Sequence, residues 1–466
     1  TKVSNNLIVG LHKIRDYRST YGSLFPFVEI SKGSGTIQVG SERSSTANEL
    51  DQDILEITNN VKIFSGKHTF TVGTHNEFFK FRNLFINNLN GRWSFNSLND
   101  FYNNNPRQVQ VTYSNIAGDP KPSAKFDASQ LGFYAQDEVQ FNNNFRLTYG
   151  LRVDVPIIGS TPGFNKAVDS TFKSAYSTSN IPNKQLLWSP RVGFNYDVTG
   201  EKKVVLRGGA GIFTGRIPFV WISNQFSNTG LLLNTVSVSD DNRTPANEVN
   251  SGQGFNPNPQ AWGSLGNAGR TYEVNLIDKK FKLPQVFRFN LATDVKLPYD
   301  IQATFEGIYS KTLNNIAYKD VNLTAPAGVV DPVYNNGADK RIAFASSTNG
   351  RRTNPNITNA IWIGNTDEGY SYNLTAQLSK TWTNFYASVA YNYNDAKDVN
   401  SGTSSTALSN WEFVQVVGVP NNPELARSSH ALRHRITSVL SYNITYAKNF
   451  KSSISFFYEG RSGRPL

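Results

Sequence analysis

Strict alternation of apolar and polar residues between positions 129 and 155 constrains the fold of this chain more than any other feature. The segment SQLGFYAQDEVQFNNNFRLTYGLRVDV has two arms joined by a short polar turn. Successive side chains of a strand point to opposite faces. The second arm therefore places Phe145, Leu147, Tyr149, Leu151 and Val153 on one face, and Arg146, Thr148, Gly150, Arg152 and Asp154 on the other. The apolar face packs on a core in a soluble sheet but meets lipid in a membrane barrel, and this hairpin alone leaves both alternatives open.

The same plan recurs along the chain. Six hairpins are predicted, at 54–64 with 68–82, 131–141 with 145–155, 188–198 with 203–215, 285–296 with 301–311, 369–380 with 385–394, and 434–446 with 450–460. A further strand is predicted at 5–14, short strands at 27–30 and 36–39, and a helical turn in SLNDFYNN. Turns of three or four residues alternate with polar segments at 83–125, 156–187, 216–284, 312–368 and 395–433.

This alternation of short turns with long loops is typical of outer-membrane barrels, which have short periplasmic turns and long extracellular loops. Loops of such length are unexpected in a compact soluble domain unless they are functional. The pattern predicts an all-β fold, a transmembrane antiparallel β-barrel with thirteen long strands in this sequence. Bacterial single-chain barrels have even strand numbers, and open sheet edges do not occur in lipid. We therefore expect residues 1–466 to be part of a larger barrel, an expectation that also fits the absence of Met.

Aromatic residues gather beside the predicted short turns: Phe141, Phe145, Tyr196, Tyr299, Trp382, Phe385, Tyr446 and Phe450. Amphipathic rings favour the headgroup region, so an aromatic girdle is expected there. Aromatic pairs across a soluble sheet are the alternative.

The predicted interior face carries polar and charged residues in mid-strand: Arg146, Arg152, Arg191, Asn195, Arg207, Arg288, Asn290 and Asp294. Such charges are costly in a dry core, whereas a lumen filled by water or by a plug accommodates them. Asp137 departs from this pattern, because it falls on the apolar face of its strand with Phe133 and Val139.

Composition excludes several classes of protein. There is no Cys, and thus no disulfide framework or thiolate site, and no apolar run is long enough for a membrane-spanning helix. The net charge of +11 is scattered along the chain, which argues against a nucleic-acid partner. The RGGAG segment that begins at Arg207 is not followed by a helix, so we expect no nucleotide cofactor.

Candidate metal ligands are also weak. His430 and His434 lead into a strand, and the acidic cluster of Asp51, Asp53 and Glu56 lacks calcium-loop spacing. No Ser-His-Asp set or carboxylate pair stands out. We therefore expect no metal, no cofactor and no enzymatic activity.

Two segments carry a family resemblance. LGFYAQDEVQFNNNFRLTYGLRVDVP and SPRVGFNYDVTGEKKVVLRGGAGIFTGR, within residues 131–216, resemble the barrel of TonB-dependent outer-membrane receptors. They are most similar to the Oar-like, carboxypeptidase-regulatory-domain subgroup common in Bacteroidetes and myxobacteria. The other hairpins match only in style.

The resemblance implies a 22-stranded barrel in the bacterial outer membrane, with an N-terminal plug and a TonB box that the TonB–ExbB–ExbD machinery contacts. Plug, TonB box and final strands are absent from this sequence, so we expect 1–466 to be a partial barrel. The implied partners are outer-membrane lipid and lipopolysaccharide, TonB, and a surface lipoprotein.

Aromatic residues on the long loops are the candidate ligand contacts: Trp221, Phe226, Trp262, Trp362 and Trp411. The alternative is that they fold the loops upon themselves. Three functions follow, in decreasing order of preference: a TonB-dependent importer that binds its ligand on the loops, a non-transporting barrel that acts as a structural subunit or adhesin, and a soluble all-β secreted binding protein.

Overall fold

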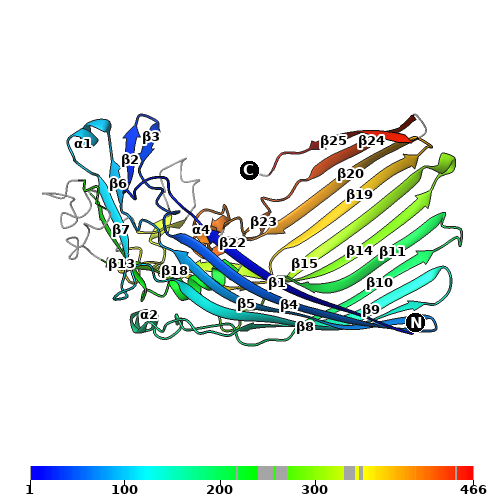
Figure 1. The fold of residues 1–466 in the computed structure, drawn as a ribbon, viewed down its shortest axis with the longest axis horizontal. Helices are drawn as coiled ribbons and strands as arrows, with labels where there is room; N and C mark the ends of the chain where they lie inside the picture. Colours follow the sequence, from blue (N-terminus) through cyan, green and yellow to red (C-terminus); the bar gives the residue numbers. More distant parts are fainter. Residues whose placement is uncertain are drawn as a thin grey trace.

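A large antiparallel sheet forms the wall of the molecule (Figure 1). The computed structural model describes residues 2–216, 219–239, 255–258, 270–329, 342–345, 350–404, 406–446 and 449–464. The wall strands are β1 (Val3–Tyr17), β4 (Asn48–Ser65), β5 (His68–Phe85), β8 (Ala124–Gln140), β9 (Phe145–Ile158), β10 (Leu187–Asp197), β11 (Val204–Thr214), β14 (Gln285–Lys296), β15 (Gln302–Asp320), β19 (Tyr370–Thr381), β20 (Phe385–Asp398), β24 (His434–Tyr446) and β25 (Phe450–Arg461).

Each wall strand pairs antiparallel with the next in this order, from β1 with β4 to β24 with β25. The all-β class, the six hairpins and the thirteen long strands predicted from the alternation are confirmed. Several strands are longer than predicted: β4 begins at Asn48 and β15 ends at Asp320. Tight turns fix the register, as at Gly66, whose φ of 59° favours a residue without a Cβ.

The two faces of the wall differ as the alternation predicts. On the convex face, apolar side chains such as Phe133, Leu151, Leu291, Phe305 and Leu374 are 45–53% exposed. An apolar surface this extensive on a folded chain marks contact with lipid or with another protein. The concave face carries the polar residues and their ion pairs.

Asp137, the exception in the sequence, lies on the convex face but is only 4% exposed. His68 Nδ1 lies 2.8 Å from Asp137 Oδ2, and the Tyr149 hydroxyl donates to the same oxygen at 3.0 Å. Both partners come from the neighbouring strands β5 and β9, and β8 ends at Gln140 close by. Cross-strand contacts near the turns thus compensate in part for burying this carboxylate, because both of them reach Oδ2 and Oδ1 has no hydrogen-bond partner.

The rings beside the short turns pack in pairs. Phe141 stacks on Phe145 at 5.5 Å between centroids, and Phe145 meets Tyr196 edge-on at 5.8 Å. Tyr446 stacks on Phe450 at 5.9 Å. The aromatic residues therefore gather at the turn end of the wall, as the sequence predicts.

Segments between the hairpins build a second body at the opposite end of the wall (Figure 1). Its strands are β2 (Phe27–Lys32), β3 (Gly35–Val39), β6 (Arg92–Phe95), β7 (Gln108–Ser114), β12 (Leu233–Ser239), β13 (Arg270–Ile277) and β18 (Ile357–Thr366). Strands β3, β2, β6, β7 and β12 pair in that order, and their core contains Val28, Trp93, Phe95, Val109 and Val236.

The remaining elements are short. They are α1 (Leu98–Tyr102), α2 (Lys166–Thr171), α3 (Phe219–Ser227), α4 (Ala407–Glu412), the 3-10 helix η3 (Pro298–Asp300), β16 (Gly328–Val329), β17 (Ile342–Ala343), β21 (Val417–Val419), β22 (Asn422–Glu424) and β23 (Ala426–Arg427). The predicted helical turn corresponds to α1, and the predicted short strands correspond to β2 and β3. Within the described ranges, every helix is too short or too polar to cross a membrane.

The loop segments contain more structure than the sequence indicated. Residues 216–284 were expected to be irregular, but they contain α3, β12 and β13. Residues 312–368 contain β18, which pairs parallel with β13 and antiparallel with the end of β15. These pairings join segments far apart in the chain, which local patterns do not reveal.

Candidate ligand-binding mouth and lumen

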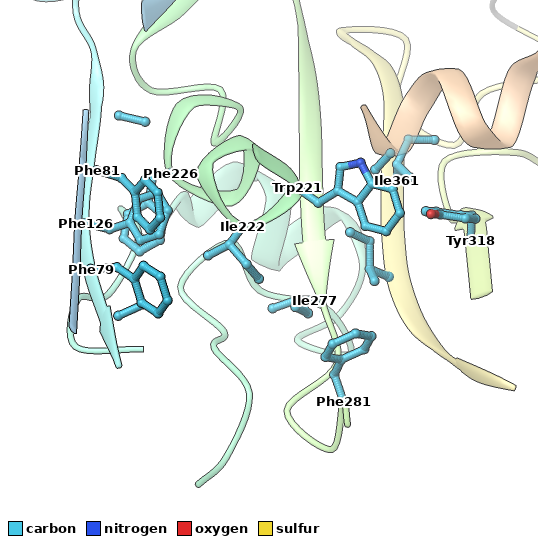
Figure 2. Close-up of a cluster of buried hydrophobic side chains, with 14 residues drawn as sticks. Phe79, Phe81, Phe126, Trp221, Ile222, Phe226, Ile277, Phe281, Tyr318 and Ile361 are labelled. Atoms are coloured by element: carbon cyan, nitrogen blue, oxygen red, sulfur yellow. The ribbon is translucent and has the colours of Figure 1, made fainter. Parts of the chain in front are cut away.

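Helix α3 lies where the loop body meets the concave face of the wall. It packs against β5, β8 and β13. Phe226 stacks on Phe126 at 4.9 Å, and Phe219 lies 4.6 Å from Phe79 and 4.8 Å from Phe81. On its other side, Trp221 points toward Tyr318 and Ile361 (Figure 2). The helix is therefore held between the wall and the loop strands by apolar contacts on two sides.

Polar contacts tie the same loop to the wall. Arg216 Nη1 lies 2.8 Å from both carboxylate oxygens of Glu77 on β5. Asn83 Nδ2 donates to Ser223 Oγ at 2.6 Å. His75 continues this cluster, because its Nε2 lies 3.6 Å from Glu77 and its Nδ1 lies 3.6 Å from Glu56. A buried carboxylate needs such partners. The loop is therefore bound to the lumen wall by an ion pair and a hydrogen bond.

A second polar cluster lies behind α3. Glu273 on β13 accepts hydrogen bonds from Asn228 at 3.0 Å and from Asn275 at 3.2 Å. Burial is the main cause that raises the pKa of Glu273 to about 7. The nearby carboxylates Glu412 and Asp320 add to this rise, and the two amide hydrogen bonds oppose it. A carboxyl with this pKa changes charge near neutral pH, inside the loop body.

The lumen wall below the mouth contains a hollow of about 340 Å³. Its lining includes His75, Tyr134, Gln136, Arg152 and Arg191. Arg152 is bound by Asp154 at 2.6 Å, and the guanidinium of Arg191 lies 4.5 Å from the centre of the Phe213 ring. Hydrogen-bond donors of both arginines thus border this hollow.

The aromatic residues singled out from the sequence occupy different environments. Trp221 and Phe226 are buried, with 5% and 9% of their surface exposed. Trp411 packs against the same cluster, and its Nε1 donates to Asn421 Oδ1 at 2.8 Å. Trp262 lies outside the described residues. Trp221, Phe226 and Trp411 thus pack within the loop body and against the wall. Their contact with a ligand stays a prediction.

Trp362, like Trp411, is only partly buried. Lys319 Nζ lies 5.8 Å from the centre of its ring, and Tyr176 meets it edge-on at 6.4 Å. A Cβ on Gly364 would lie 2.0 Å from the ring, so this glycine gives the indole its space.

The histidines and acidic residues considered as metal ligands are not brought together. His434 Nδ1 lies 2.7 Å from the Tyr391 hydroxyl, and His430 Nε2 lies 3.2 Å from the carbonyl of Ser401. Asp51 and Asp53 bind Arg15 at 3.9 Å and 2.7 Å. Across the described part of the chain, no group of three or more His, Asp or Glu side chains could hold a metal ion.

Sequence reasoning missed Glu77, Arg216 and Glu273. Glu77 sits on the interior face of a predicted strand, a signal that could have marked it. Arg216 and Glu273 lie in the segment expected to be irregular, and their partners are 45 to 139 residues away in the chain. No local pattern points to them.

Comparison with known proteins places these features in context. The family model described as "Outer membrane beta barrel domain" matches residues 2–456. No curated protein sequence matches significantly. Among solved structures, the outer membrane transporter YddB from Escherichia coli is similar, with a TM-score of 0.53, 11% identity, and coverage of 98% of this chain and 53% of that chain.

Two further structures show weaker similarity. The siderophore receptor PirA from Acinetobacter baumannii has a TM-score of 0.46 and 14% identity, over 95% of this chain and 46% of that chain. The FrpB iron transporter from Neisseria meningitidis has a TM-score of 0.45 and 10% identity, over 88% and 44%. The chain thus spans about half the length of the structures it matches.

Proposed function

Because this chain belongs to the outer membrane β-barrel domain family and lies in the outer membrane, we propose that it forms part of a TonB-dependent transporter of the Oar-like type. An extracellular ligand binds at the mouth formed by the long loops. Energy from TonB–ExbB–ExbD then drives its import. The whole protein supplies the plug, the TonB box and the strands that complete the barrel.

The observation that carries this proposal is the concave face. Arg207 binds Asp294 at 3.1 Å and Glu306 at 3.3 Å, and Arg152 binds Asp154, all in mid-wall. Charges in such a position need water or a polar occupant in the interior. A barrel that only anchors a structural subunit or adhesin in the membrane does not require a polar interior.

Growth tests this function directly. A strain lacking the gene is grown on single candidate nutrients beside the wild type and beside a strain lacking TonB. Loss of growth on the same nutrient in both mutants supports import. If every nutrient supports equal growth in all three strains, the transport proposal fails.

A non-transporting structural subunit or adhesin is the second candidate. The loop sheet β3–β2–β6–β7–β12 favours it, because this sheet has a hydrophobic core of its own and presents a folded surface outward. The growth experiment separates the two, since an adhesin gene is dispensable for nutrient uptake but is needed for attachment to a surface or to other cells.

The position of the chain in the outer membrane also indicates partners, namely lipopolysaccharide and a surface lipoprotein. On the convex face beyond the apolar band, Arg15, Lys80, Arg82 and Lys125 lie among Asp51, Asp53 and Asp127 around a hollow of about 300 Å³. Cations at this level suit the phosphates of lipopolysaccharide. A surface lipoprotein over the mouth is a further proposal, and its test is co-purification with the full-length protein from native membranes.

Ligand contact at the loops is proposed first for Trp362. Its ring is more accessible than those of Trp221 and Phe226, which would contact ligand only after α3 moves. Trp411, like Trp362, is partly buried. Quenching of tryptophan fluorescence by ligand, compared between wild type and Trp362→Phe, tests this choice. Equal quenching in both proteins would move the contact elsewhere.

A further inference from the structure

The concave wall has two chemically different halves. From β4 to β15 it carries ion pairs, namely Arg146 with Glu138, Arg152 with Asp154, and Arg207 with Asp294 and Glu306, and the ring of His75 lies 3.6 Å from both Glu56 and Glu77. We call this half the charged wall. Its side chains are long and are held by partners on the same or neighbouring strands.

The half formed by β19, β20 and β24 is almost neutral. Its concave positions are Ser371, Asn373, Thr375, Gln377, Ser379 and Thr381 on β19, Tyr386, Ser388, Ala390, Asn392, Asn394 and Ala396 on β20, and Thr437, Val439, Ser441, Asn443 and Thr445 on β24. We call this half the neutral wall. None of these described positions holds Asp, Glu, Lys, Arg or His. The charged concave residues of the same strands are Asp398, at the end of β20, and Arg435, near the start of β24 and paired with Glu459 at 2.9 Å.

Hydrogen bonds between amides and hydroxyls cover the neutral wall. Asn392 Nδ2 donates to Thr375 Oγ1 at 2.8 Å and also to Asn373 Oδ1. Ser441 and Ser455 share a hydrogen bond at 2.8 Å. These groups hold one another without fixed charge, and each retains further donors or acceptors.

The loop helices lie over the other half of the mouth. The main contacts of α3 with the wall are on β5 and β8, and those of α4 are on β15 and β18. Arg216 adds its ion pair with Glu77 on the same side. The main contacts of the loop helices therefore lie on the side of the wall that carries the charges, whereas on the neutral side the short strand β23 pairs with β20.

We propose that ligand passes through the lumen along the neutral wall, while the charged wall holds the interior domain of the transporter in place. This inference rests on the proposed transport function. The neutral wall suits a ligand whose surface is rich in hydroxyl and amide groups.

The physical reason lies in the strength of the contacts. A typical hydrogen bond contributes only about 1 kcal/mol net, whereas charge-assisted bonds are roughly twice as strong. A path must bind its ligand well enough to admit it and weakly enough to release it. The ion pairs of the charged wall join wall residues to one another, so they present a fixed polar surface that suits a permanent neighbour better.

Cysteine labelling tests the proposal without knowledge of the ligand. The chain contains no Cys, so single cysteines can be introduced once any in the rest of the full-length protein are replaced by Ser. Thr375→Cys and Ser388→Cys report on the neutral wall. Thr58→Cys and Gln136→Cys, at similar distances from the short turns, report on the charged wall. A small membrane-impermeant maleimide is added to intact cells.

We expect the two neutral-wall cysteines to react at least about tenfold faster than their charged-wall counterparts. Labelling of denatured protein controls for intrinsic reactivity. Equal rates, or faster labelling of the charged wall, would overturn the assignment of the path even if growth still depends on TonB. Growth that is independent of TonB together with faster neutral-wall labelling would instead reject transport and leave the asymmetry of the wall intact.

Discussion

At the scale of single residues, the wall tolerates an acidic side chain on its convex face only because neighbouring strands pair with it. Asp137 meets His68 and Tyr149, one from each adjacent strand. Removing a carboxylate that satisfies two donors leaves both of them unpaired in an apolar setting. The position is thus sensitive to hydrogen bonding more than to charge.

We expect Asp137→Ala to lower the free energy of unfolding of the full-length protein by about 1–3 kcal/mol. Asp137→Asn keeps an acceptor oxygen and should lose clearly less. Urea unfolding of the protein reconstituted in lipid vesicles measures both variants. Equal losses for Ala and Asn would show that the charge itself, and not the hydrogen bonds, matters here.

Glu273 gives the loop body a pH dependence whose sign is fixed. Its pKa is raised to about 7 in the folded protein, above the ordinary value of 4.5, mainly by burial. Between these two values the folded state binds more protons than the unfolded state, so stability falls as pH rises. The full contribution is present below pH 4.5 and is lost as pH rises through 7.

For wild type, we expect the free energy that protects β13 amides from hydrogen exchange to fall from pH 5 to pH 8 by up to about 3 kcal/mol. Glu273→Gln keeps the side chain's shape without titrating, so its protection, corrected for intrinsic exchange, should change little over this range. A wild-type profile as flat as that of the variant would contradict the raised pKa.

At the scale of elements, sequence predicts the wall strands well and the loops poorly, for a physical reason. The alternation of a strand can be recognised from a short stretch of sequence, because successive residues point to opposite faces. This local pattern correctly predicted β9, β10 and β11. The order of β13 beside β18 depends on contacts between Leu276 and Trp362, far apart in the chain. The expectation that residues 216–284 are irregular failed there.

The candidate site shows the same division. Aromatic residues on long loops could be named from sequence, but which of them are buried depends on where α3 packs. Trp221 and Phe226 lie against wall residues such as Phe126 from another hairpin. The ion pair between Glu77 and Arg216 spans 139 residues and is equally invisible to local patterns.

Helix α3 should detach when its stacking contact is removed. Phe226→Ala deletes a buried ring and is expected to destabilise the packing of α3 by about 3–5 kcal/mol. A helix as short as α3 is not stable without tertiary contacts, so this loss should be enough to release it. Limited proteolysis and hydrogen exchange of residues 219–227 should show opening, while β9 and β10 stay protected. Phe413→Ala, which removes an exposed ring at the end of α4, serves as the control and should leave α3 closed.

At the scale of the whole molecule, the wall has two edge strands whose outer backbone groups need hydrogen-bond partners in the membrane. Within the described residues, β1 pairs on one side with β4, and β25 pairs on one side with β24. About half of the backbone groups of an edge strand point away from its partner. In hydrocarbon each unsatisfied group costs several kcal/mol, so we propose that further strands cover these edges in the membrane.

Residues 1–466 alone should therefore fail to insert as a stable barrel into lipid vesicles, whereas the full-length protein should insert and resist protease. The comparison uses equal protein concentrations and the same lipid, with protection of the β4–β5 hairpin from protease as the readout. Concentration dependence adds a second criterion, because two copies of 1–466 could cover each other's edges only in a bimolecular step. Protection of 1–466 that is complete and independent of concentration would mean that β1 and β25 meet within one chain, and the proposal that further strands complete the barrel would then be wrong.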